Sequence, residues 1–318
     1  MTSSPTRSVP DRLPRLLVTG ASGFVGQALR EHWHQGWAQH YQWLEAETAY
    51  DLRDPAAVRQ VVAHLRPDAV LHLAAQSFVP AAFKDPATTL DINLKGTLHL
   101  LQALQAEGFN GRLLFVSSAD LYGAVPEHQL PVTEDQPAQP RNPYAVSKAA
   151  AELLCHQWGF SEGFDIVIAR PFNHVGPGQE ARFVLSGFAR QIARIRLGLA
   201  PPRIVTGNLD VTRDFSSVQS VLAAYLALLR HGRAGATYNV CSGRELPLAT
   251  ALQRLLQLAD VQASCHTDPA LVRPHEQWRM CGSPARLIHD TGWQPDTSLD
   301  ATLAAMLAWW LSKETDPS

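Results

Sequence analysis

Four short apolar runs, separated by longer segments with helical spacing, are the feature that most limits what this chain can fold into. These runs are LLVTG (16–20), AVLHLAA (69–75), RLLFVSS (112–118) and DIVIAR (165–170). Uninterrupted apolar runs of this length are typical of strands that are buried on both faces of a parallel sheet. Parallel strands need crossover connections, so the order predicts an α/β protein built on a doubly wound parallel sheet.

Two Asp-Pro pairs mark expected helix starts between these strands. DPAAV (54–58) and DPATT (85–89) each offer an Asp as helix cap and a Pro at the first helical position. A missing N–H costs nothing at that position, so both segments predict crossover helices.

The second half of the chain has a different pattern, which predicts a smaller α/β lobe at the C-terminus. Proline and glycine become frequent after Arg170, and helices are expected at 183–197, 248–258 and 300–312. The segment 211–229 is expected to be a helix that returns to the first lobe. The expected divisions are a first domain at 13–172 with 211–232 returning to it, a second lobe at 173–210 and 233–318, and a disordered tail at 1–12.

Charge and cysteine content exclude several classes of partner. The 318 residues carry a formal net charge of -2, so no basic field is available to hold nucleic acid or an anionic membrane surface. The four cysteines lie far apart, which predicts neither a metal site nor a disulfide framework: Cys155, Cys241, Cys265 and Cys281. The sequence contains no apolar signal segment and no run of 18 apolar residues. We therefore expect a cytoplasmic protein whose partners are small molecules or copies of itself.

A glycine triplet follows the first expected strand. Gly20, Gly23 and Gly26 connect that strand to a segment with helical spacing. Glycine tolerates positive φ and carries no side chain against a ligand, while the backbone N–H groups at a helix start attract phosphate. The spacing G-x-x-G-x-x-G in this position predicts a cradle for the pyrophosphate of a dinucleotide, with a purely structural turn as the alternative.

The residues expected at the adenosine end leave the choice of dinucleotide open. Glu45 and Glu47 would favour NADH over NADPH if they reach the ribose, because carboxylates repel the extra phosphate. Asp51 is a candidate to accept a hydrogen bond from the adenine amine, or alternatively an acid at the next helix start. Both NADH and NADPH remain open on these residues.

Tyr144 and Lys148 are four positions apart at a helix start that is expected directly after Asn142. They share one helix face, and an adjacent ammonium is expected to lower the tyrosine pKa from its usual value near ~10. Ser117 and Ser118 end an expected strand at the sheet edge where ligands of open α/β folds bind. Together these groups predict a site that protonates a ketone while a nicotinamide supplies hydride.

Taken together, these motifs resemble the extended short-chain dehydrogenase/reductase family. The resemblance covers the chain from about Arg15 to Trp310 and rests on TGASGFVG (19–26), DLRD (51–54), HLAAQ (72–76), Asn93, SSADLYG (117–123), NPYAVSK (142–148) and RPFNHVGPGQ (170–179). It implies a dinucleotide-binding Rossmann domain and a lobe that binds a nucleotide-diphosphate sugar. Within the family, the motifs are most similar to those of enzymes that reduce the 4-keto group of GDP-4-dehydro-6-deoxy-D-mannose to give GDP-D-rhamnose.

The resemblance also implies roles for individual residues. The implied catalytic residues are Ser118, Tyr144 and Lys148. The implied cofactor contacts are Gly20, Gly23, Phe24, Val25, Gly26, Asp51, Leu52, Leu73, Ala74, Ala75, Asn93, Tyr144, Lys148 and Pro171. The implied substrate contacts are Gln76, Ser118, Asp120, Tyr144, Asn173, Arg213, Arg273 and Glu276. The two arginines suit a diphosphate, because a planar guanidinium offers paired hydrogen bonds to its oxygens.

Sister activities of the family, and one activity outside it, remain as alternatives. The 4,6-dehydratases carry a Thr followed by acidic residues where this chain has Ser118, Ala119 and Asp120, so Asp120 keeps a dehydratase open. Reductase-epimerases use a Cys and a His, and His174 has no evident cysteine partner. A non-catalytic nicotinamide sensor would need only the glycine cradle.

The expected helices at 88–107 and at 144–158 carry wide apolar stripes. These stripes offer more apolar surface than packing on one face of a sheet requires. In relatives the corresponding helices form a four-helix bundle, so the resemblance implies a homodimer.

Overall fold

A six-stranded parallel sheet forms the larger part of the computed structural model, which describes residues 12–46, 49–272, 277–295 and 298–315. The strand order is β2-β1-β3-β4-β5-β9, so the chain moves to one edge and then to the other. The strands are β1 (Arg15–Thr19), β2 (Gln42–Leu44), β3 (Ala69–His72), β4 (Arg112–Val116), β5 (Asp165–Pro171) and β9 (Thr237–Val240). This topology confirms the doubly wound α/β fold.

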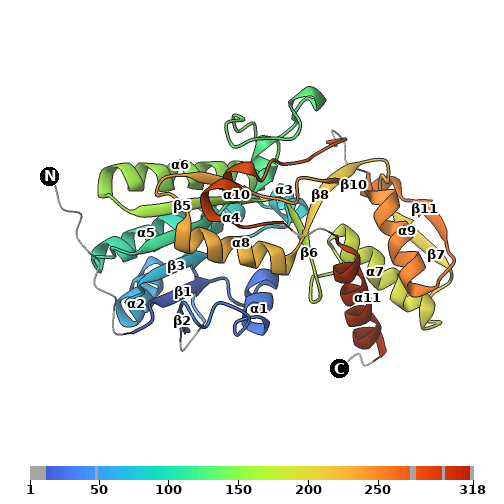
Figure 1. Ribbon diagram of the computed structural model, residues 1–318, viewed down its shortest axis with the longest axis horizontal. Helices are drawn as coiled ribbons and strands as arrows, with labels where there is room; N and C mark the ends of the chain where they lie inside the picture. Colours follow the sequence, from blue (N-terminus) through green and yellow to red (C-terminus); the bar gives the residue numbers. More distant parts are fainter. Residues whose placement is uncertain (1–11, 47–48, 273–276, 296–297, 316–318) are drawn as a thin grey trace.

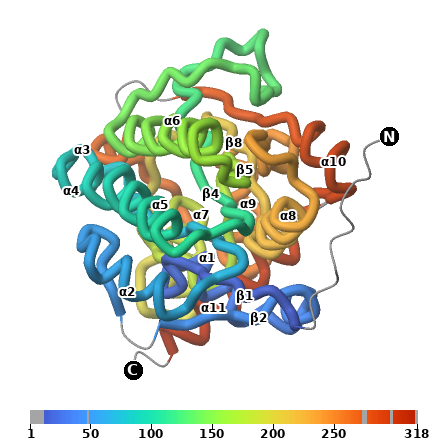
Figure 2. Tube along the Cα trace, turned by 90° about the vertical axis from the view of Figure 1, so that its left-hand side faces the viewer, coloured from blue at the N-terminus to red at the C-terminus, as the bar shows by residue number. Residues whose placement is uncertain are grey.

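Helices cover both faces of the sheet (Figure 2). One face packs against α2 (Pro55–Leu65), α5 (Gly96–Ala106) and α6 (Pro143–Glu162) through a core that includes Leu17, Val70 and Phe115. The other face packs against α1 (Phe24–Glu31) and α8 (Val218–His231). Residues of β4 alternate between these two cores, as expected for a strand buried on both sides.

Both expected Asp-Pro helix starts are confirmed. Asp54 caps α2 by accepting hydrogen bonds from the N–H groups of Ala56 and Ala57 at 2.9 and 3.2 Å. Asp85 caps the short helix α4 (Pro86–Leu90) in the same way and follows α3 (Val79–Lys84). The single helix expected at 88–107 is interrupted, because a π-helical turn (Asp91–Lys95) lies between α4 and α5.

The smaller lobe lies beyond the carboxyl ends of the parallel strands, on the right of Figure 1. It contains a three-stranded sheet of β6 (Asn173–Val175), β8 (Thr212–Ser217) and β10 (Glu245–Pro247), and the parallel pair β7 (Arg203–Thr206) and β11 (Ser264–Thr267). The helices α7 (Val184–Arg196), α9 (Leu248–Ala259) and α11 (Asp300–Thr315) share a second apolar core. All three lie close to the ranges expected from the sequence.

Two expected ranges differ from the structure. The segment 211–229 is not one helix, because its first part is strand β8 and the helix begins only at Val218. The range 233–318 does not belong wholly to the second lobe, since β9 pairs with β5 and α10 (Ala285–Thr291) packs on α8. β9 is only TYNV, a run too short and too polar to be recognised as a strand of the main sheet.

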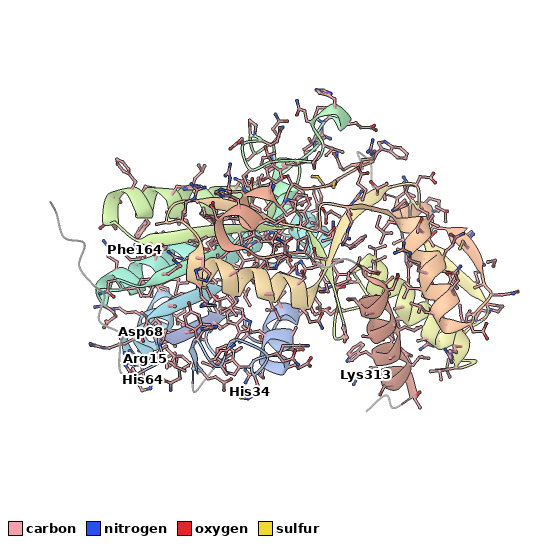
Figure 3. All side chains as sticks on the ribbon, viewed as in Figure 1. Arg15, His34, His64, Asp68, Phe164 and Lys313 are labelled. Carbon is pink, nitrogen blue, oxygen red and sulfur yellow. The ribbon has the colours of Figure 1, made fainter. Side chains whose placement is uncertain are left out.

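The described residues place the amino ends of the strands far from the second lobe. Arg15, Asp68 and Phe164 stand before or at the start of three strands, and Figure 3 shows them at the end of the molecule opposite Lys313 of α11. Of the expected tail at 1–12, residues 1–11 lie outside the described residues, while Arg12 forms an ion pair with Asp68 at 2.9 Å. No helix among the described residues is long and apolar enough to cross a membrane.

Candidate active site

The glycine turn after β1 brings two neighbouring strands into close contact. Gly20 has φ +74°, and a Cβ at this position would lie 2.6 Å from the backbone nitrogen of Ala74, at the end of β3. A Cβ at Gly26 would lie 2.5 Å from Cα of Ala21. Only glycine fits both positions, because one needs the left-handed conformation and both lack room for a side chain. Gly23 has more room, since its nearest contact would be 3.4 Å away.

The first turn of α1 presents its backbone N–H groups without a side-chain cap. Gly23 is the cap residue, and no side chain among the described residues accepts a hydrogen bond there. Phe24 stacks on His174 of β6 with ring centres 6.1 Å apart, which fixes the start of the helix against the second lobe. An uncapped helix start behind a glycine turn fits the pyrophosphate of a dinucleotide.

The segment that the sequence predicts at the adenosine end carries two ion pairs. The Asp51 carboxylate accepts hydrogen bonds from the side chain and from the backbone N–H of Arg53. These hydrogen bonds lower the pKa of the Asp51 carboxyl. Glu45 follows β2 directly and pairs with Arg30, whose guanidinium also lies over the ring of Trp43. Leu52 is buried beside Gly96. Glu47 lies outside the described residues, and Asp54, rather than Asp51, caps the next helix.

Tyr144 and Lys148 lie in the first two turns of α6 and point into the protein. The expected helix start is confirmed, since Asn142 caps α6 by accepting from the N–H of Ala145 at 2.8 Å and Pro143 occupies the first turn. Tyr144 and Lys148 are only 9% and 3% exposed. This burial puts both reactive groups in a low-dielectric environment, where charge interactions are strong.

The pKa of Tyr144 moves in the opposite direction to the one expected from the sequence. Burial raises it to about 12, Ser118 lowers it through a side-chain hydrogen bond, and the charge of Asp120 raises it. The prediction that this pKa is lowered is therefore wrong, because burial disfavours the charged phenolate. Tyr144 holds its proton at neutral pH, as a proton donor must.

The Lys148 side chain lies over the ring of Phe115 in β4, with Nζ 4.8 Å from the ring centre. Burial lowers the pKa of Lys148 to about 8, while Cys155 and Glu152 act to raise it. Lys148 is therefore a cation at neutral pH, but its pKa lies much closer to neutral pH than that of an ordinary lysine. Its neighbour His72 is neutral, since burial and Lys148 lower the His72 pKa to about 3.

Gln76 and Asn93 connect the loop after β3 to the catalytic helix. Asn93 Oδ1 accepts from the N–H of Gln76 at 2.8 Å, and its Nδ2 donates to Ser147 Oγ on α6 at 2.8 Å. The side chain of Gln76 contacts Thr89 and the N–H of Phe78. Both amide groups hold protein segments in place, beside the ligand contacts that the resemblance implies for them.

A chain of hydrogen bonds extends from Asn93 to the end of β1. Thr97 donates to the Asn93 carbonyl at 2.7 Å and lies 3.0 Å from Nε2 of His72, whose Nδ1 lies 2.6 Å from Thr19 Oγ1. Thr19 in turn accepts from the N–H of Ala74 at 3.3 Å, which fixes the loop of Leu73, Ala74 and Ala75.

Asp120 is tied to the cap of the catalytic helix. Its Oδ2 accepts from Nδ2 of Asn142 at 2.7 Å, and its backbone N–H donates to Ser118 Oγ at 3.1 Å. These bonds join the 3-10 turn Ala119–Tyr122 to the start of α6. His174 is partly buried and bonded to the Phe172 carbonyl, so both residues have structural partners in this arrangement.

The substrate residues expected on the second lobe are described only in part. Arg213 donates to the carbonyls of Thr212 and Gln277 at 2.8 and 2.7 Å. Asn173 is exposed on β6 and makes a hydrogen bond to the carbonyl of Asp214 at 3.4 Å, and Pro171 is buried at the end of β5. Arg273 and Glu276 lie outside the described residues.

Two buried polar groups, Tyr225 and Glu152, were not recognised in the sequence, whereas Ser117 was. Ser117 Oγ and Tyr225 Oη have no hydrogen-bond partner among the described residues, which fits a site that takes a polar ligand. Glu152 lies one further turn along the face of Tyr144 and Lys148 and is paired with Arg170. The sequence could have indicated Glu152, because the four-residue spacing of Tyr144 and Lys148 continues to position 152.

Comparisons with known proteins agree with this geometry. The family model for GDP-mannose 4,6 dehydratase matches residues 41–306. The chain is 51% identical to GDP-6-deoxy-D-mannose reductase of Pseudomonas aeruginosa over 94% of this chain and 98% of that protein. It is similar to the solved structure of RMD from Pseudomonas aeruginosa complexed with NADPH (TM-score 0.90, 50% identity, covering 94% and 99% of the two chains). It is also similar to the UDP-glucose 4-epimerase of Thermus thermophilus in complex with NAD (TM-score 0.81, 28% identity, 93% and 98%).

Proposed function

Because the chain belongs to the GDP-mannose 4,6-dehydratase family of extended short-chain dehydrogenase/reductases, we propose that it reduces the 4-keto group of GDP-4-dehydro-6-deoxy-D-mannose to GDP-D-rhamnose with NADPH or NADH. The observation that carries this proposal is the meeting of Ser118, protonated Tyr144 and cationic Lys148 at the carboxyl edge of the sheet. The similarity over nearly the whole chain to a reductase with this activity supports the choice of substrate.

Each residue of the site has a separate task. A bound NADPH or NADH supplies the hydride. Ser118 donates a hydrogen bond to the sugar carbonyl, and Tyr144 transfers its phenolic proton to the oxygen as negative charge develops there. A phenol with a pKa of about 12 is still more acidic than an alcohol, so this proton transfer is favourable. Lys148 stabilises the phenolate that remains and binds the ribose next to the nicotinamide.

The residues proposed to hold the cofactor follow from the cradle. The uncapped N–H groups of Phe24, Val25 and Gly26 bind the pyrophosphate, and Asp51 and Leu52 border the adenine. The relative of known structure binds NADPH, whereas Glu45 in this chain follows β2 at the position where a carboxylate favours NADH. Both dinucleotides therefore belong in the test.

A substrate panel tests the proposed function. Freshly generated 4-keto-6-deoxy sugars linked to GDP, UDP and dTDP are each mixed with the purified protein and with NADPH or NADH, and nicotinamide absorbance is followed. We expect turnover with the GDP-linked ketone, and NMR of the product gives the configuration at C4. Dinucleotide binding without any turnover would instead favour a sensor.

A dehydratase is the second candidate and has its own assay. GDP-mannose is supplied without the ketone, and formation of a 4-keto product with no net change in nicotinamide absorbance would favour it. The bond between Asp120 and Asn142 argues against this outcome, because it gives Asp120 a structural partner.

We further propose that two copies of the chain associate through α5 and α6. The outer face of α6 exposes Val146, Leu153 and Phe160 at seven-residue spacing, and Phe160 is 94% exposed. Beside this face is an open hollow of about 420 Å³, lined by Phe83, Leu90, Pro140, Arg141, Asn142, Pro143 and Val146. Apolar residues in such a row are typical of helix–helix interfaces.

Light scattering tests this association. At micromolar concentration we expect the wild-type mass to be that of a dimer and Leu153→Glu to give a monomer. Leu199→Glu on the second lobe changes a residue that is also exposed, so it serves as the matched control. A wild-type monomer would contradict the proposed association without affecting the proposed reaction.

A further inference from the structure

A third ionisable residue continues the reactive face of α6. Tyr144, Lys148 and Glu152 are spaced four residues apart, so they lie along one side of the helix. Glu152 is only 4% exposed, although carboxylates are seldom buried without a strong partner. Another group in the protein must therefore offset the cost of removing this carboxylate from water.

Arg170 is that partner. Its Nε donates to the two Glu152 oxygens at 3.0 and 3.3 Å, and its Nη2 donates to Oε2 at 2.7 Å. Arg170 is itself 9% exposed, and burial of this kind requires a charge pair with good geometry.

The guanidinium of Arg170 is fixed from its other side. Its Nη1 donates to Tyr122 Oη at 3.0 Å, and its Cζ lies 4.9 Å from the centre of the Tyr122 ring. Tyr122 in turn donates to Asn239 Oδ1 of β9 at 2.7 Å. The pair is thus anchored to β5, β9 and the 3-10 turn that follows Ser118, and it cannot move away from α6 independently.

Two buried cations share one buried anion at this place. Lys148 and Arg170 are buried cations, and Glu152 is the buried anion that acts on both. The remaining groups facing Lys148 are uncharged at neutral pH: Tyr144 and Cys155 of α6, whose pKa values are raised by burial, His72 of β3, and the ring of Phe115. Without Glu152, two cations would remain with no counter-charge in a low-dielectric environment.

We propose that Glu152, held by Arg170, is a positioning residue that keeps Lys148 charged beside Tyr144 and so sets the pH above which the enzyme loses activity. This inference rests on the proposed function, in which Lys148 acts as a cation. Tyr144 itself loses its proton only near pH 12, so the upper limb of the pH profile belongs to Lys148.

Charge-changing variants of the buried pair, with a matched control on the same helix, provide the test. We expect Glu152→Gln to move the upper limb of the kcat/KM profile to lower pH by about one unit or more, because a nearby counter-charge is removed. Arg170→Gln removes the partner that allows Glu152 to be buried as an anion, so the limb is expected to move to lower pH in this variant too. Glu162→Gln changes an exposed glutamate at the end of the same helix and is expected to leave the limb unchanged.

A conservative variant separates charge from packing. Glu152→Asp keeps the charge but shortens the side chain, so we expect a lower melting temperature with the limb at its wild-type pH. A limb that stays at the wild-type pH in folded Glu152→Gln, or that moves equally in the Asp variant, would overturn the proposal. If the Gln variant does not fold, the Arg170→Gln limb decides the question, and a limb at the wild-type pH there would also overturn the proposal.

Dinucleotide binding gives a readout that does not depend on the sugar substrate. The dissociation constant of NADPH is measured from tryptophan fluorescence between pH 6 and pH 10 for the wild type and for Glu152→Gln. We expect the alkaline loss of affinity to begin at a lower pH in the variant, because the cation that binds the ribose is lost earlier. A wild type that binds NADPH with this pH dependence but reduces no ketone would refute the proposed function and leave the role of Glu152 supported.

Discussion

α1 and α6 both begin at the carboxyl edge of the same sheet, but their first turns are built in opposite ways. α1 starts at Gly23 with no side-chain cap among the described residues, behind a turn where backbone segments nearly touch. α6 starts at Asn142, which caps the helix and is itself held by Asp120. An open helix start binds an anion with its own N–H groups, whereas a closed start orients side chains. The binding task and the chemical task are thereby assigned to different helices.

Removal of the phenol from α6 should have the largest effect. We expect Tyr144→Phe to lower kcat by about 10²- to 10⁴-fold, because general acid catalysis is lost, while NADPH affinity changes little. Steady-state rates and fluorescence titration measure the two quantities. Tyr50→Phe, which changes a partly buried tyrosine packed against the core of the sheet, is the control. An undiminished rate in Tyr144→Phe would show that α6 does not supply the proton donor.

A side chain in the α1 cradle should affect both stability and binding. We expect Gly20→Ala to lower the free energy of unfolding by more than the ~1–2 kcal/mol that the left-handed conformation alone costs, because its Cβ also meets Ala74. Dinucleotide affinity should fall with it. Gly198→Ala has a similar φ of +71° with nothing within 4 Å, so denaturant unfolding should show only the conformational cost. Equal losses in the two variants would contradict the close contact between the strands.

Replacement of Lys148 should show that this catalytic residue of α6 lowers the stability of the folded protein. Lys148→Met is expected to be inactive but to melt at a higher temperature at pH 7, since a buried ammonium is replaced by an apolar chain. The pKa of Lys148 is about 8 in the folded state against 10.5 for an ordinary lysine, so the unfolded chain binds more protons between these values. Wild-type stability should therefore rise relative to the variant from pH 8 to pH 10.5. Scanning calorimetry at several pH values would show a constant difference if this assignment were wrong.

Loss of the α6 cap should have the smallest effect of the four. Asn142→Ala is expected to cost about 1 kcal/mol of stability and to lower kcat modestly, because Tyr144 lies two residues from the cap. Asp54→Ala removes the cap of α2, which is not part of the site, and should cost similar stability with unchanged kcat. Identical kcat values in both variants would mean that the cap does not help to orient Tyr144.

Local sequence signals were sufficient for much of the fold. The starts of α2, α4 and α6 follow from Asp-Pro and Asn-Pro pairs, and four of the six main strands follow from apolar runs. β9 and β8 were missed, because TYNV and TRDFSS are short and rich in polar residues and gain their strand partners only when distant segments meet. Pairing between residues far apart in sequence leaves little local trace.

By itself, the sequence determined which reactive groups share one helix face, because the four-residue spacing of Tyr144 and Lys148 needs only helical geometry. It also determined that a glycine turn follows the first strand. Only the tertiary structure decided the direction of the Tyr144 pKa shift and the pairing of Glu152 with Arg170. The physical reason is that desolvation and charge pairing depend on how many distant segments surround a group, and that number is fixed only when the chain is folded.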